Sequence, residues 1–210
     1  MTTPMTAFKD EDTLIQALID KSETAFRHAL TECQPSMLYL AHSMVGNKLA
    51  DEVVQEAWFS AMRALPKFER RSKLKTWLMR IVANEAKTRL RRENRQVSLD
   101  VMLEPDDTMD SRFDSKGHWQ NNPLDWDGDS PEALLSSDEL LDCIDDMIAT
   151  LPDLQSATLN LRERQGYSLV EICNILDVSE SNVRVLLHRA RNRVFRCIEH
   201  FQDSGECCTI

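Results

Sequence analysis

Glycine and tyrosine are scarce in this 210-residue sequence, which contains only five Gly and two Tyr. Turn glycines and aromatic strand residues accumulate in β-rich folds, so their scarcity argues against such a fold. No apolar run approaches the roughly 18 residues of a membrane-spanning helix, and the first residues lack the basic and apolar segments of a signal peptide. We therefore expect a soluble, cytoplasmic, all-α protein that makes no membrane contact.

Motifs for catalysis and cofactor binding are also missing from the sequence. It has no Gly-rich phosphate loop, no nucleophile motif and no cluster of His, Asp and Glu with metal-ligand spacing, and its five His are scattered. Apolar residues nevertheless make up 42% of the chain, which is enough for a real core. We expect neither enzymatic activity nor a cofactor.

Six cysteines are present, and in a cytosolic chain of this size reduced thiols are expected more often than a disulfide framework. Those within predicted helices should lie in or near the core. Soft ligands close to the C-terminal end could bind zinc or copper, or could form a redox switch. Their spacing is not an established zinc spacing, however, and adjacent cysteines are poor partners for one disulfide. We predict no resident metal; the candidate ligands are Cys197, His200, Cys207 and Cys208.

Charge is distributed unevenly along the chain, although the total is −10 and the pI is near 5.0. Residues 51–98 carry twelve basic and six acidic side chains, whereas residues 99–150 carry two basic and fifteen acidic ones. Nucleic acid responds to the local potential within a Debye length of about 8–10 Å. The basic segment is therefore a candidate for nucleic-acid binding despite the acidic total.

Apolar spacing predicts four helices in the first half of the chain. They cover 12–32 with Ser22 as a break or cap, 36–45 after Pro35, 50–65 and 73–92. Residues 99–131 then concentrate Pro, Gly, Asp and Asn without any period, which indicates an acidic linker. Helical patterning returns at 130–131. The predicted organisation is two small helical domains, at 1–98 and 132–201, joined by the linker 99–131 and followed by a Cys-containing tail at 202–210.

A helix-turn-helix pattern occupies residues 153–196. A helix at about 153–164 ends near Gly166, and Ser168 with Glu171 forms a capping box that opens a helix at 169–176. A three-residue turn follows, and Ser179 can cap a longer basic helix at about 180–200. The face of that helix opposite its apolar stripe would lie in the DNA major groove. Its residues include Asn192, and the predicted base-contacting set is Ser181, Asn182, Arg184, Val185, His188 and Arg189.

The segment 73–92 is the second candidate for DNA contact. Seven of its twenty residues are Lys or Arg and one is acidic. On a helical wheel its apolar residues fall on one side, while basic and polar residues, including Thr76, fall on the other. A solubility helix would interleave Glu with these basic residues, so phosphate binding is the better explanation. Trp77 lies at the border, where it could stack on a base or pack in the core.

Three stretches in this order resemble the extracytoplasmic-function (ECF) sigma factors of the sigma-70 family. ADEVVQEAWFSAMRALPKF (50–68) is similar to the polymerase-binding helix of region two, and SKLKTWLMRIVANEAKTRLRR (72–92) to the helix that contacts the −10 element. The stretch 151–194 is similar to region four. The resemblance covers roughly 150 of the 210 residues. It implies a factor that binds core RNA polymerase and directs promoter recognition and melting.

The resemblance also assigns roles to positions of this sequence. Region two would bind the polymerase β′ clamp, region four would bind the β flap and the −35 element, and residues 68–75 would match a loop that captures an extruded base. This loop carries basic residues where many relatives have Gly, Ser or Glu. The implied polymerase contacts are Asp51, Gln55, Glu56 and Arg63, and the implied −10 contacts are Lys73, Trp77, Arg80, Asn84, Lys87 and Arg91.

Several interpretations stay open at this stage. A conventional helix-turn-helix regulator with an N-terminal sensing domain is the main alternative, and an anti-sigma or adaptor protein would not need two DNA-contacting faces. The acidic linker could mimic nucleic acid in positive polymerase channels or be a solvated spacer. Trp119 and Trp126 within it could dock on polymerase or fold back on a domain. The family implies an anti-sigma partner, whereas the promoter sequence and inducing signal are not encoded in any recognisable motif.

Overall fold

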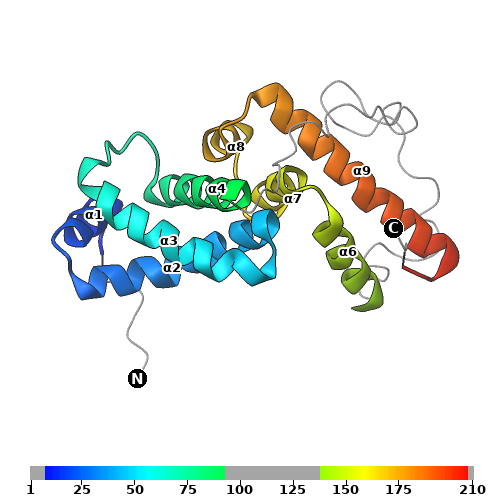
Figure 1. Cartoon of the computed structure of the whole chain (residues 1–210), viewed down its shortest axis with the longest axis horizontal. Coiled ribbons are helices and arrows are strands. Elements are labelled where there is room, and N and C mark those ends of the chain that lie inside the picture. Colours follow the sequence, from blue (N-terminus) through cyan, green and yellow to red (C-terminus); the bar gives the residue numbers. More distant parts are fainter. Residues whose placement is uncertain (1–7, 93–137, 208–210) are drawn as a thin grey trace. The chain divides into compact units, whose positions relative to one another are not determined.

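The computed structural model describes residues 8–92 and 138–207, and the regular structure of these residues is entirely helical, as predicted (Figure 1). None of the described helices is long and apolar enough to cross a membrane. The predicted linker 99–131 and its two tryptophans lie outside the described residues. In chain order the elements are α1 (Glu11–Ile19), α2 (Glu23–Val45), α3 (Asn47–Ala64), the 3-10 turn η1 (Leu65–Lys67), α4 (Leu74–Arg92), α6 (Asp138–Thr150), α7 (Asp153–Leu159), the π-helical turn η4 (Asn160–Arg164), α8 (Leu169–Leu176) and α9 (Glu180–Ser204).

These elements belong to two compact units. The first contains α1 to α4 together with residues 160–178, and the second contains α6, α7 and α9. The domain boundaries predicted from the sequence stay a prediction, since the segments that would separate the domains are not described.

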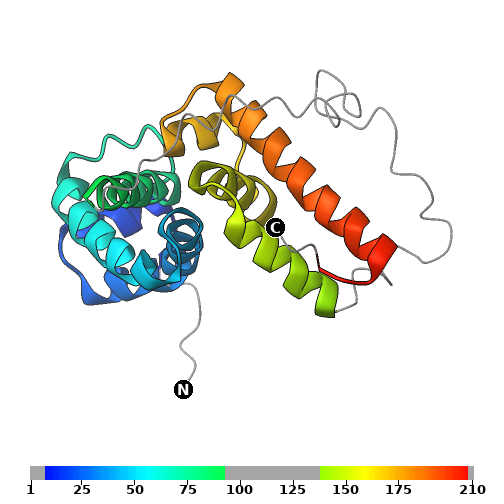
Figure 2. The same ribbon diagram turned by 45° about the vertical axis from the view of Figure 1, so that its right-hand side comes forward.

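The core of the first unit forms where α2, α3 and α4 pack together (Figures 1 and 2). Ser22 caps α2 by accepting a hydrogen bond from the Ala25 amide, which confirms its predicted role as a cap. Gly46, at φ 75°, ends α2 and begins α3, and a left-handed backbone of this kind favours glycine. On α1, α2 and α4 the largest side chains that are almost fully buried are Ile15, Met37, Leu40, Met44, Leu78, Met79 and Leu90.

The prediction that Pro35 separates two helices is wrong, because α2 continues through it from Glu23 to Val45. An internal proline removes one helical hydrogen bond and costs roughly 3 kcal/mol. Apolar side chains on both sides of Pro35, such as Cys33 and Met37, are nevertheless buried in the same core. Their packing outweighs the local cost, and the exposed proline ring lies at the surface.

The second unit is held by an apolar cluster between α6, α7 and α9. Cys143 and Met147 come from α6, and Ala190 and Cys197 come from α9, with Leu151 and Leu159 completing the buried set. Ser179 caps α9 by accepting a hydrogen bond from the Asn182 amide. The helix runs four residues beyond its predicted end and stops at Gly205, whose φ is 70°.

The predicted signals around α8 are confirmed in detail. The Ser168 hydroxyl accepts from the Glu171 amide, and the Glu171 carboxylate accepts from the Ser168 amide, so the capping box is complete. The Ser168 amide and the Ser168 hydroxyl each donate a hydrogen bond to the Glu171 carboxylate, and these two bonds, the amide's first, hold the pKa of Glu171 below its ordinary value. Asp177 ends the helix in the left-handed conformation at φ 52°. This geometry supplies the tight turn that the sequence indicated.

Candidate nucleic-acid and polymerase interfaces

Helix α4 presents a polar face opposite its buried one. Leu78, Val82 and Ala86 are buried, whereas Arg80, Asn84 and Arg91 are exposed. The three exposed residues are spaced four and seven positions apart, so they lie along one side of the helix. We call these three residues the α4 ridge. Lys73, which precedes the helix, is also exposed.

Lys87, which the sequence placed in the same row, is half-buried instead of exposed, and its side chain has a partner within the protein. Its ammonium donates a hydrogen bond to the carbonyl of Leu176 within the first unit. Burial lowers the pKa of Lys87, and the nearby Asp177 carboxylate acts in the opposite direction. A DNA phosphate would therefore have to compete with a backbone carbonyl for this ammonium.

Two neighbours of the ridge have packing roles. Trp77 is half-buried, and its ring lies 4.7 Å from the ring of Phe68 between centroids, in a tilted arrangement. Thr76, which the helical wheel placed on the polar face, is instead 6% exposed. A wheel assigns residues by angle alone, whereas α4 is covered on more than one side in the first unit.

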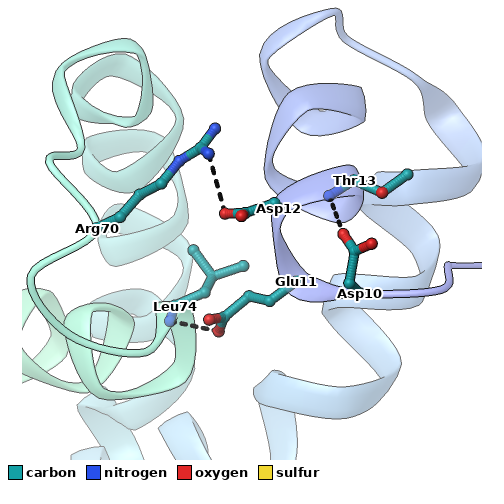
Figure 3. Close-up of polar contacts among 6 residues, drawn as sticks. All are labelled: Asp10, Glu11, Asp12, Thr13, Arg70 and Leu74. Atoms are coloured by element: carbon teal, nitrogen blue, oxygen red, sulfur yellow. Dashed lines mark hydrogen bonds and ion pairs between the residues drawn. The ribbon is translucent and has the colours of Figure 1, made fainter.

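The loop that precedes α4 is pinned to the start of α1, as Figure 3 shows. The Glu11 carboxylate accepts a hydrogen bond of 2.7 Å from the Leu74 amide, which is the first amide of α4. Arg70, in a left-handed conformation at φ 57°, forms an ion pair of 2.9 Å with Asp12. Glu11 therefore caps α4 from another helix, where a carboxylate also complements the positive end of the helix dipole. No local motif in the sequence indicates this cap.

The four predicted polymerase contacts on α3 are all exposed, but they face different surroundings. Asp51 and Gln55 line an apolar groove of about 650 Å³ beside α1 and α2. Glu56 instead lines a small crevice beside α4. Arg63, near the end of α3, donates to the Ser60 hydroxyl at 3.3 Å. The structure thus brings only two of the four residues together in one recess.

Phe59 is the residue of this groove that the sequence analysis missed. Its side chain is 63% exposed beside the nearly buried Trp58, and both line the groove. A large apolar side chain outside the buried stripe of an amphipathic helix was the available signal. We call this recess the α2–α3 groove. Its remaining lining residues are Leu18, Lys21, Ser22, Glu23, Phe26, Gln34, Leu38, Asp51, Val54, Gln55 and Met62.

Helix α9 presents the predicted base-contacting face at its N-terminal half. Ser181, Arg184 and Val185 are exposed, and Asn182, His188 and Arg189 are partly exposed. Arg184 pairs with Glu180 at 2.5 Å, but both side chains are about half exposed. Such surface pairs contribute little to stability, so the guanidinium can exchange partners at low cost.

Asn192 does not belong to this face, contrary to the sequence-based assignment. Its side chain is 4% exposed. The buried surface of α9 is therefore broader than the apolar stripe counted from the sequence, and it includes this polar residue.

The cysteines depart from the sequence-based expectation of reduced thiols. Cys143 and Cys207 form a disulfide, although 64 residues separate them. Cys197 joins them, and the three sulfur atoms lie within 4.8 Å of one another. His200, the other described candidate ligand, is exposed and is not part of this group, while Cys208 lies outside the described residues. A contact between residues so far apart in the chain carries no spacing signal, which is why the pair was missed.

Comparison with known protein families matches two segments of the chain. Residues 30–96 match the model "Sigma-70 region 2", and residues 141–194 match the model "Sigma-70, region 4". The first segment contains the α4 ridge and much of the α2–α3 groove, and the second contains the exposed face of α9.

Curated relatives are similar over most of the chain. A Haemophilus influenzae protein described as "Probable RNA polymerase sigma factor" is 34% identical over 172 residues, which cover 80% of this chain and 87% of the relative. The "ECF RNA polymerase sigma-E factor" of Escherichia coli K12 is 31% identical over 185 residues, which cover 88% of this chain and 92% of that protein.

Two solved structures share the fold. The sigma factor RpoE of Bartonella quintana, in complex with the anti-sigma factor NepR, matches with a TM-score of 0.53 and 19% identity, over 86% of this chain and 98% of that one. CnrH, in complex with the cytosolic domain of CnrY, matches with a TM-score of 0.57 and 18% identity, over 90% of this chain and 97% of that one.

Proposed function

This chain belongs to the sigma-70 family, among its ECF-type members, and on that premise we propose that it is a transcription initiation factor. It binds core RNA polymerase, brings the enzyme to a promoter and helps to melt the DNA, in the bacterial cytoplasm and without enzymatic activity of its own. The match of residues 30–96 to sigma region 2 supports this over the alternative of an N-terminal sensing domain.

Polymerase docks at the α2–α3 groove in this proposal. The groove combines an apolar floor with a polar rim, the arrangement typical of a protein-binding patch. Phe59 provides a large exposed ring, and aromatic anchors of this kind often dominate binding energy. Asp51 and Gln55 on the rim supply hydrogen-bonding groups for a partner helix. Among the predicted contacts, these two residues are therefore the stronger candidates, with Glu56 and Arg63 at the periphery.

The α4 ridge holds the −10 element. Arg80 and Arg91 are exposed cations that can pair with phosphates, and Asn84 between them carries an amide that can donate to and accept from a base edge. The loop before α4 captures an extruded base. Its attachment to α1 through Arg70 and Glu11 supports this role, since a pocket for one base must keep its shape when the DNA is melted.

The N-terminal half of α9 contacts the −35 element in the major groove. Ser181, Arg184, Val185 and His188 share one side of the helix at i, i+3, i+4 and i+7 spacing. Arg184 can form two hydrogen bonds with a guanine, and Val185 can contact a thymine methyl group.

A partner protein regulates access to these faces. Both solved structures described above were determined as complexes, with an anti-sigma factor in the first case and with the cytosolic domain of CnrY in the second. We propose a partner of the same class here, which binds this chain and withholds it from polymerase.

The observation that carries the proposal is that the two family matches occur in the correct order and that the first matched segment contains the exposed α4 ridge. Run-off transcription with core RNA polymerase tests it. We expect transcripts with one defined start site on a template carrying the promoter of its own gene, and none from core polymerase alone. Specific binding to duplex DNA without polymerase, combined with no defined start site, would instead establish a conventional regulator.

A further inference from the structure

A cluster of three cysteines in the second unit has no part in the proposed promoter and polymerase contacts. Cys143 lies on α6, Cys197 lies on α9, and Cys207 follows the end of α9. Cys143 and Cys197 are 2% and 1% exposed, whereas Cys207 is exposed. We call this group the three-cysteine cluster.

The chain after α9 is shaped to bring Cys207 back to Cys143. Gly205 ends the helix in the left-handed conformation, which reverses the chain direction. The Ser204 hydroxyl donates to the His200 carbonyl at 2.7 Å and accepts from the Glu206 amide at 3.1 Å. These bonds define the turn two residues before Cys207, so its position follows from local structure as well as from the disulfide.

The sulfur atoms of the three-cysteine cluster are close enough to one another to exchange bonds. Cys207 is bonded to Cys143, and the Cys143 and Cys197 sulfur atoms are 3.3 Å apart. An accessible thiol next to a second thiol is the arrangement of known redox-sensing cysteines. Cys33 provides the contrast: it is buried in the first unit, and burial raises the pKa of its thiol to about 11. Such a thiol is almost never ionised near neutral pH and is inert.

We propose that the three-cysteine cluster is a peroxide-reactive modification site, at which a hydroperoxide oxidises Cys207 and Cys143 then captures it as a reversible disulfide. In the first step the Cys207 thiolate attacks the peroxide, the O–O bond breaks, and Cys207 becomes a sulfenic acid while an alcohol or water leaves. In the second step the Cys143 sulfur attacks the Cys207 sulfur, the S–O bond breaks, and water carries away the Cys143 proton. In total, two thiols and one hydroperoxide give one disulfide, one water molecule, and the alcohol or second water molecule that left in the first step.

The resulting disulfide links Cys207, which follows the end of α9, to Cys143 on α6. Both α6 and α9 belong to the second unit, and the disulfide adds a covalent link to their apolar packing. Val185, on the proposed DNA-contacting face, is twelve residues from Cys197, which is about 18 Å along a helix. The expected consequence is a more stable α6–α9 pair, with the residues of the DNA-contacting face left unchanged.

Peptide mapping of the full-length protein tests the proposal without any reference to transcription. The chain is reduced, freed of reductant without oxygen, treated with hydrogen peroxide, alkylated and digested under non-reducing conditions. We expect a Cys143–Cys207 cross-linked peptide that dithiothreitol removes, while Cys33 remains alkylated. A folded protein in which peroxide forms no Cys143–Cys207 link, or links Cys33 equally well, would overturn the proposal.

Serine variants locate the reacting thiol. Cys207→Ser removes an exposed side chain, so the fold should be retained, as circular dichroism can verify; we expect oxidation of the cluster to slow by at least about tenfold, because the remaining thiols are buried. Cys33→Ser and Cys208→Ser are the matched controls and should leave the link intact. Loss of the link in Cys208→Ser with normal oxidation of Cys207→Ser would contradict the assignment. So would one zinc ion per chain that protects the reduced cluster from peroxide, which would establish a metal site.

Discussion

Replacing Phe59 with alanine should weaken polymerase binding far more than it affects folding. A phenylalanine side chain that is fully buried covers roughly 200 Å², and Phe59 is 63% exposed, so about 125 Å² remains for a partner to cover. At about 25 cal/mol per Å² this area contributes up to about 3 kcal/mol of binding free energy. Since alanine retains part of it, we expect a loss of about 2–3 kcal/mol, or about 30- to 150-fold in Kd.

The assay is a titration of fluorescently labelled protein with core RNA polymerase, followed by anisotropy, with thermal denaturation of each free variant alongside. Phe59→Leu retains most of the apolar area and should lose less than about tenfold. Glu52→Gln, on the same helix but outside the α2–α3 groove, should bind as the parent does. The melting temperature should be unchanged in both Phe59 variants, because an exposed side chain contributes little to the core.

One result would refute the reasoning about the groove. If Phe59→Ala binds core polymerase with unchanged affinity while Glu56→Ala or Arg63→Ala binds weakly, the docking surface lies on the other side of α3. The apolar groove would then need a different occupant.

Three further predictions follow from the hydrogen bonds and exposed residues of the first unit. Asn84→Ala should abolish discrimination among −10 sequences in run-off transcription while leaving the affinity for core polymerase intact; a fall in that affinity would mean that the ridge faces polymerase. Glu11→Ala should lower the free energy of unfolding by about 1 kcal/mol in denaturant titrations, the usual effect of losing a helix cap, and an unchanged value would show that water replaces the carboxylate. Because its hydrogen bonds to Ser168 hold the pKa of Glu171 below its ordinary 4.5, Glu171 stabilises the fold above pH 4.5, and this contribution is lost as the pH falls below it. Glu171→Gln can keep the capping box and should be less sensitive to acid in that range, so equal acid sensitivity would remove Glu171 as a cause.

Local signals in the sequence predicted the local structure well. Ser168 and Glu171 are three residues apart, and both partners of the capping box are therefore visible in one short motif. The bounds of α8 agree with the prediction, because cap and turn residues fix them without help from distant parts of the chain. Arg80 and Asn84 were placed correctly on an exposed face for the same reason, since helical periodicity is a local property.

Long-range contacts could not be predicted in this way. The Glu11 cap on Leu74 joins residues 63 positions apart, and the Cys143–Cys207 disulfide spans 64 positions. Pro35 is a strong local breaker, but the burial of residues on both sides of it decides the outcome. In each case the deciding free energy comes from partners that only the folded chain brings together.

The cap that Glu11 places on α4 bears on how hybrid sigma factors could be assembled from this chain. The match to sigma region 2 begins at residue 30, so it leaves out α1 and with it both Glu11 and Asp12. A chimera joined at residue 30 would leave the first amide of α4 without its acceptor and Arg70 without its carboxylate. The smallest transplantable region-2 module is therefore longer than its family signature, and grafts should keep the donor and acceptor helices from the same parent.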